Sequence, residues 1–118
     1  MTDHALTVRP QHDASGARVL VVRGDLDYHS APVLSGALEE QGFAPGARYV
    51  IDLSGLKYCD STGITVMVTA YQRASAAGSR LELAGVGDDL ARVFRIMGLD
   101  QVFTFAPPVA EALGEPGA

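Results

Sequence analysis

The residue types most able to do chemistry lie together in one segment near the middle of the chain, Asp60-Ser61-Thr62-Gly63. An apolar pattern with helical spacing follows this segment, so Asp60 is expected to cap a helix and Ser61 to lie in its first turn. Free backbone N–H groups and the positive end of the helix dipole lie there, which suits an anion. The residues alone leave two hypotheses open: Asp60, Ser61 and Thr62 only cap a helix, or the Ser61 hydroxyl is phosphorylated.

The remaining candidate catalytic residues argue against an enzyme. The three histidines, His4, His12 and His29, all precede Ser61, whereas a hydrolase with its nucleophile on a strand-to-helix turn needs a later histidine. The sequence contains no His-x-x-x-His or Cys-x-x-Cys pair for zinc and no Gly-x-x-x-x-Gly-Lys loop for a nucleotide. We therefore expect no catalytic residue, no metal site and no cofactor.

Composition narrows the class of partner. The 118 residues include 9 basic and 14 acidic side chains, which gives a formal charge of −5. Nucleic acids and anionic membranes attract clustered Lys and Arg, so neither is expected as a partner. Cys59 is the single cysteine and excludes an internal disulfide. The N-terminus lacks the pattern of a signal peptide, and we expect a cytoplasmic protein.

Strand-like and helix-like patterns alternate along the chain, which predicts an α/β domain with a mostly parallel sheet. A hairpin is expected to open the sheet, because turn-forming residues separate the first two strands. The stripe Leu90, Val93, Phe94 and Met97 has helical spacing and is expected in the core. The expected strands cover 6–9, 17–23, 48–53, 80–84 and 101–105. The expected helices follow the cap Ser30, begin at Thr62 and follow the cap Asp88.

The length predicts one domain over residues 1–118. Its core is expected over 6–105, and the segment 106–118, rich in Gly and Pro, is expected to be a loose tail with at most a short helical turn. Loops are expected at 24–27, after the second strand, and at 54–60, before the second helix. Both loops carry the acidic and hydroxyl residues of interest.

Five segments stand out by their order and spacing: Gly24-Asp-Leu-Asp27, Ser30-Ala-Pro-Val-Leu34, Ile51-Asp-Leu-Ser-Gly-Leu56, Asp60-Ser-Thr-Gly-Ile64 and Leu90-Ala-Arg-Val-Phe-Arg-Ile-Met-Gly-Leu99. Together they resemble a STAS domain and, more narrowly, a bacterial anti-sigma-factor antagonist. The resemblance runs from about Leu6 to Phe105, nearly the whole chain. Asp-Ser-Thr-Gly is its most specific motif, and Gly-x-Leu-Asp supports it.

The resemblance implies a STAS fold with a mixed sheet of four to five strands and about four helices mainly packed on one side. It also implies partner switching. An unphosphorylated antagonist of this family binds an anti-sigma factor, which is a serine kinase with a histidine-kinase-like ATPase fold, and thereby frees a sigma factor. Phosphorylation of the serine ends the interaction, and a phosphatase restores it.

The family's site residues carry over onto matching positions of this sequence. Its phosphorylated serine falls on Ser61, and its acidic residue before that serine falls on Asp60. Its acidic loop falls on Asp25 and Asp27, although the family usually has Glu where this chain has Asp25. The resemblance also places the start of the helix, near Thr62 and Gly63, in the surface that binds the partner.

Two other hypotheses remain open. An adaptor or scaffold subunit of a transporter ATPase or a sensor complex would use the same fold without phosphorylation. A sensor of a small molecule or nucleotide would bind phosphate at the helix N-terminus. A monomer is the expected state of the unbound chain under each hypothesis.

Overall fold

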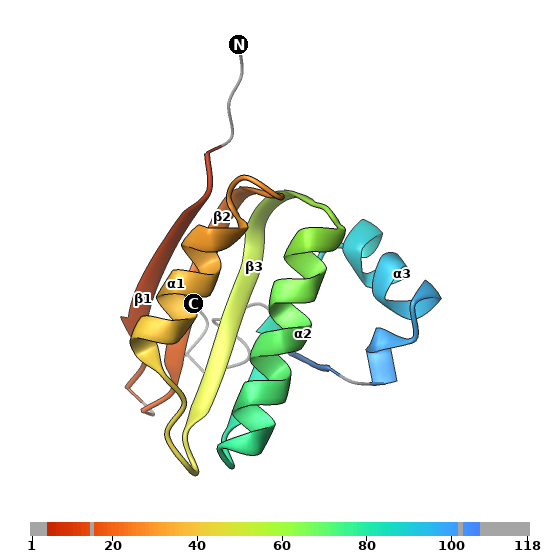
Figure 1. Cartoon of the computed structure of the whole chain (residues 1–118). Coiled ribbons are helices and arrows are strands. Elements are labelled where there is room, and N and C mark those ends of the chain that lie inside the picture. The colour runs from red at the N-terminus through yellow and green to blue at the C-terminus, as the bar shows by residue number, and fades with distance from the viewer. Residues whose placement is uncertain (1–4, 15, 102, 107–118) are drawn as a thin grey trace.

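The computed structural model describes residues 5–14, 16–101 and 103–106 of the chain. Strands and helices alternate after an opening hairpin, as the sequence pattern predicts (Figure 1). The elements are β1 (Thr7–His12), β2 (Arg18–Leu26), α1 (Ala31–Gln41), β3 (Arg48–Cys59), α2 (Ser61–Ala76), β4 (Arg80–Ala84), α3 (Asp88–Ile96), the 3-10 turn η1 (Leu99–Gln101) and β5 (Thr104–Ala106).

The five strands form one sheet in the order β1-β2-β3-β4-β5. The hairpin makes β1 antiparallel to β2, and every other neighbouring pair is parallel, because a helix carries the chain back between those strands. The prediction of a mixed α/β sheet of four to five strands is thus confirmed. Pro10 lies in the edge strand β1, where a missing N–H donor is tolerated.

The main core lies between the sheet and the helices. Figure 1 shows α1 and α2 side by side over one face of the sheet, with α3 beside α2. The core takes Leu34 from α1, Met67 from α2 and Phe94 from α3, all fully buried against the strands. Rings extend it toward β5, since Phe94 lies 5.5 Å from Phe103 between ring centroids.

The described residues contain three α-helices and one 3-10 turn, rather than the four helices expected. The loose tail was predicted over 106–118, but Ala106 is the last residue of β5. The rest of that segment, with the predicted helical turn, lies outside the described residues, so the boundaries of the domain stay a prediction. No helix in the described part of the chain combines the length and the apolar character that crossing a membrane requires.

Two predicted loops are strand instead. β2 continues through Gly24 to Leu26, and β3 continues to Cys59, whereas loops were expected at 24–27 and 54–60. The reason is their mutual pairing, which places Asp25 opposite Tyr58 and Leu26 opposite Cys59. Hydrogen bonds to a neighbouring strand stabilise an extended chain even where local sequence favours a turn.

The predicted core stripe on α3 is partly wrong. Phe94 is fully buried, but Val93 and Met97 are 38% and 53% exposed. The helix packs at the side of α2 and not over the centre of the sheet, so only one edge of its apolar face is covered (Figure 1). An exposed apolar surface therefore remains on α3.

Candidate functional site

The two acidic segments singled out in the sequence meet at one edge of the sheet. Parallel neighbours β2 and β3 end there together, and Leu26 pairs with Cys59. The next residues, Asp27 and Asp60, therefore lie beside each other at the carboxyl ends of the two strands. Gly24 shapes this edge, because a register shift follows it and its φ of +99° suits glycine.

Asp60 connects the two strand ends. Its Oδ1 atom accepts a hydrogen bond of 3.1 Å from the N–H of Gly63, which caps α2 as the sequence predicts. Its Oδ2 atom accepts a hydrogen bond of 3.1 Å from the N–H of Tyr28, and its own N–H donates to the carbonyl of Leu26. The start of α2 is therefore held to the segment between β2 and α1.

Ser61 is the first residue of α2 and is exposed. Its carbonyl accepts a hydrogen bond of 3.0 Å from the Thr65 hydroxyl, while its side chain projects from the first turn of the helix. Thr62 follows it and is half-buried, so the two neighbouring hydroxyl residues differ in access to solvent. The first turn of a helix favours added negative charge, so a phosphate on Ser61 is compatible with the helix.

Gly63 is buried where α2 crosses the end of β2. A Cβ atom at this position would lie 2.6 Å from Leu26 Cγ and 2.9 Å from Cys59 Sγ. These distances are shorter than contact distances, so the glycine allows the close approach of the helix to the strands. A direct contact between Gly63 and a partner stays a prediction.

The segment from Asp25 to Ser30 is ordered by its own hydrogen bonds. The Ser30 hydroxyl donates to the carbonyl of Asp25 at 2.7 Å and accepts from the N–H of Asp27 at 2.9 Å. The Asp27 carboxylate accepts from the N–H groups of Ser30 and His29 at 2.9 and 3.0 Å. These bonds lower the pKa of Asp27, and the bond from the Ser30 N–H has the largest effect.

Two of the helix caps expected from the sequence are wrong. Ser30 precedes α1, but no side-chain hydrogen bond from it caps that helix, so its predicted capping role is wrong. It organises the turn before α1 instead, a role that its type alone does not reveal. Gly87, not Asp88, occupies the cap position of α3, and Asp88 lies in the first turn. One oxygen of Asp25, Oδ1, is shielded from solvent.

Cys59 is the residue before Asp60 and is half-buried. Burial, with a smaller contribution from the neighbouring Asp60 charge, raises the pKa of its thiol to about 12. The thiol is therefore neutral at ordinary pH and a poor nucleophile. Over the described residues, no group of three His, Cys, Asp or Glu side chains is arranged to hold a metal ion.

Comparison with known proteins agrees with this architecture. A STAS family model, described as "Mlab, STAS domain", matches residues 11–107. The chain belongs to the STAS domain family. In particular, it is 37% identical over 83 residues to the anti-sigma-B factor antagonist of Listeria monocytogenes, covering 70% of this chain and 73% of that protein.

Two further relatives are of the same kind. The anti-sigma-B factor antagonist of Bacillus subtilis is 35% identical over 81 residues, covering 69% of this chain and 73% of that protein. The crystal structure of an anti-sigma factor antagonist from Mycobacterium paratuberculosis has a TM-score of 0.79 and 26% sequence identity. That match covers 93% of this chain and 92% of the other.

Proposed function

We propose that this chain is an anti-sigma-factor antagonist controlled by phosphorylation of Ser61. In its unphosphorylated form it binds an anti-sigma factor that is a serine kinase, and this binding releases a sigma factor. The observation that carries the proposal is the exposed Ser61 at the first position of α2. It lies beside Asp60, whose carboxylate joins the start of α2 to the N–H of Tyr28. The names of the three relatives support the same role.

The effect of a phosphate follows from the charges around Ser61. A phosphoserine adds about −1.5 to −2 charges and three acceptor oxygens. Asp27 and Asp60 already lie at the same edge of the sheet, so the phosphate would nearly double the local negative charge. A partner that covers this edge would then bury unpaired charges of like sign, which opposes binding. The fold itself has no comparable conflict, because the dipole of α2 favours the anion.

The acids also explain binding before phosphorylation. The carboxylates of Asp27 and Asp60 accept hydrogen bonds from backbone N–H groups. A carboxylate oxygen that accepts one hydrogen bond can accept a second, from an Arg or Lys of the partner. Asp25, Thr62 and Gly63 complete the proposed partner surface through their positions around this edge. The chain contributes a substrate hydroxyl and no catalytic group, so ATP and magnesium would come from the kinase.

The proposed cycle needs two partner proteins and one compartment. The first is an anti-sigma factor with a histidine-kinase-like ATPase fold, and the second is a phosphatase that restores Ser61. Both would act in the cytoplasm on a monomer of this chain.

A comparison of two baits tests the proposal. Ser61→Ala keeps the helix without a phosphorylation site, and Ser61→Asp adds a fixed charge. We expect Ser61→Ala to capture a kinase of this ATPase class from extract of the bacterium that encodes the chain, and Ser61→Asp to lose it. Ser75→Ala and Ser75→Asp are matched controls, because Ser75 is exposed on the same helix far from Asp60.

The Ser75 variants show whether the loss of binding is specific to a charge at Ser61. Both Ser75 variants should capture the kinase as the wild type does, since their charge change lies at the other end of α2. If both Ser61 baits capture the same proteins, for example a transporter ATPase, then the proposal that phosphorylation of Ser61 controls binding is wrong. The chain would then be a constitutive adaptor in which Ser61 only begins a helix.

A further inference from the structure

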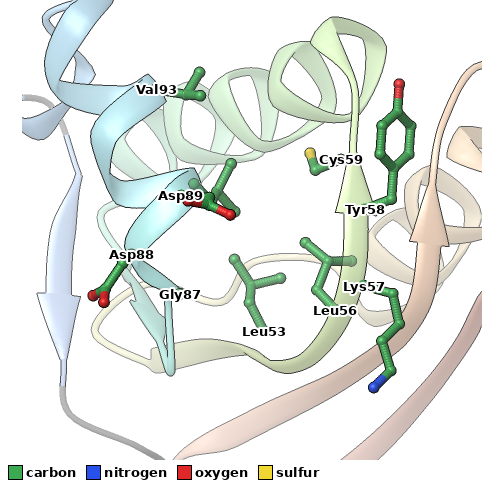
Figure 2. Close-up of a pocket in the computed structure, with 10 residues that line it drawn as sticks. Leu53, Leu56, Lys57, Tyr58, Cys59, Gly87, Asp88, Asp89 and Val93 are labelled. Carbon is green, nitrogen blue, oxygen red and sulfur yellow. The ribbon is translucent and has the colours of Figure 1, made fainter.

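A cleft lies between the second half of β3 and the first two turns of α3 (Figure 2). Its volume is about 530 Å³, and its apolar walls include Leu53 and Leu56 from the strand and Leu90 and Val93 from the helix. Figure 2 shows Leu53 and Leu56 directed into this cleft. Figure 1 shows α3 at the side of α2, and the cleft lies between this helix and the second half of β3.

The charged residues at its rim define the chemistry of an occupant. Asp88 and Asp89 lie in the first turn of α3, at the positive end of that helix dipole. They cancel the attraction that a free helix N-terminus has for an anion, so a phosphate or nucleotide is disfavoured. Lys57 also borders the cleft but is turned away from it (Figure 2). An apolar group with a cation beside it fits this arrangement.

The cleft is continuous with the phosphorylation site. Cys59 lines the cleft, and its Sγ atom lies 3.5 Å from the carbonyl oxygen of Asp60. The same sulfur fills the space where a side chain on Gly63 would begin. Tyr58, also in the wall, is 55% exposed and pairs with Asp25 of β2. A protein that covers Ser61 would therefore cover the mouth of the cleft as well.

We propose that this cleft is a second anchor point for the anti-sigma factor and binds an apolar side chain that has an Arg or Lys next to it. This inference rests on the proposed function, because it names where the same partner docks. A stable interface has a core of buried side chains and a polar rim, and a few anchors seated in pockets supply most of the binding energy. The site at Ser61 is polar and exposed, and the cleft supplies the apolar part.

The first test places a charge inside the cleft. Val93→Asp introduces a carboxylate among apolar walls, and Ile96→Asp introduces the same group on an exposed position of α3 that does not line the cleft. The binding partner is the purified kinase captured by Ser61→Ala. We expect Val93→Asp to weaken binding at least about tenfold and Ile96→Asp by less than about threefold. Circular dichroism and thermal melts of both variants establish that they fold.

The second test reverses a charge at the rim. Asp89→Arg should slow association with the kinase and reduce its dependence on salt, because it removes an attraction for the cation. Glu40→Arg is the matched control, since Glu40 is exposed on α1 and lies outside the cleft. Asp89→Asn should have an intermediate effect.

The outcomes distinguish the proposal of an anchor in the cleft from the proposed function of Ser61. If Ser61→Asp abolishes binding but Val93→Asp binds like Ile96→Asp, the cleft proposal is overturned and the proposed function stands. If Ser61→Asp binds like the wild type, the proposed function is overturned, and the anchor proposal with it. A thermal shift with millimolar ATP or inorganic phosphate that Val93→Asp abolishes would instead identify an anion site and overturn the anchor.

Discussion

The N-termini of α2 and α3 both follow parallel strands at the same edge of the sheet, yet they are built differently. Asp60 caps α2 with its side chain and also bonds the N–H of Tyr28, 32 residues away. Gly87 begins α3 without a side-chain cap, and the first turn of α3 carries two acids that face solvent.

The difference separates a helix start that is bonded to a distant segment from one that has no side-chain cap. The start of α2 is held by hydrogen bonds to another segment of the chain, so the proposed phosphate on Ser61 would change surface charge without removing these bonds. The start of α3 has no such connection through a cap, and it borders a cleft. We expect stability to depend strongly on the first region and weakly on the second.

Gly63→Ala should give the largest loss of stability and would locate the tightest point of the first region. Its Cβ would clash with Leu26 and Cys59, and we expect unfolding to become easier by about 2 to 3 kcal/mol. The matched control is Gly36→Ala on α1, where a Cβ meets no atom within 4 Å. That variant should be more stable by about 0.5 to 1 kcal/mol, because alanine has a higher helix propensity than glycine. Urea unfolding measures both, and equal effects would refute the close packing at Gly63.

Asp60→Ala compares the two helix starts directly. It removes the acceptor for the N–H groups of Gly63 and Tyr28, and we expect a loss of about 1 to 2 kcal/mol. Asp88→Ala removes only a charge near the dipole of α3 and should lose about 0.5 kcal/mol. Thermal and urea unfolding of the pair check the difference. A loss for Asp88→Ala as large as that for Asp60→Ala would mean that the cap is not what distinguishes the two regions.

Asp27→Asn should change the free energy of unfolding least, and the change should appear as the pH falls. The N–H groups of Ser30 and His29 favour the ionised Asp27, so its folded-state pKa lies below its ordinary value. The resulting stabilisation is present above the unfolded-state pKa and is lost as pH falls through the lower, folded-state pKa. Urea unfolding from neutral pH to about pH 3 should show a smaller decline for Asp27→Asn. Parallel curves for the two proteins would contradict this assignment.

Local rules in the sequence anticipated the order of elements, the opening hairpin and the cap of α2. Asp60 was recognisable as a cap because its type and its place before a helical pattern are both local properties. The same rules failed at Ser30, whose type also suits a cap but whose hydroxyl bonds within the preceding turn. They failed again at Val93 and Met97, because spacing defines an apolar face but not what covers it.

The sequence by itself determined that strands alternate with helices and that Ser61 opens the second of those helices, since periodicity and capping act over a few residues. Only the tertiary structure decided that β2 and β3 continue to Leu26 and Cys59, because pairing between strands far apart in the chain overrides local turn preference. That pairing brings Asp60 to the N–H of Tyr28. The packing of α3 beside α2 opens the cleft along β3, and no local pattern encodes that placement.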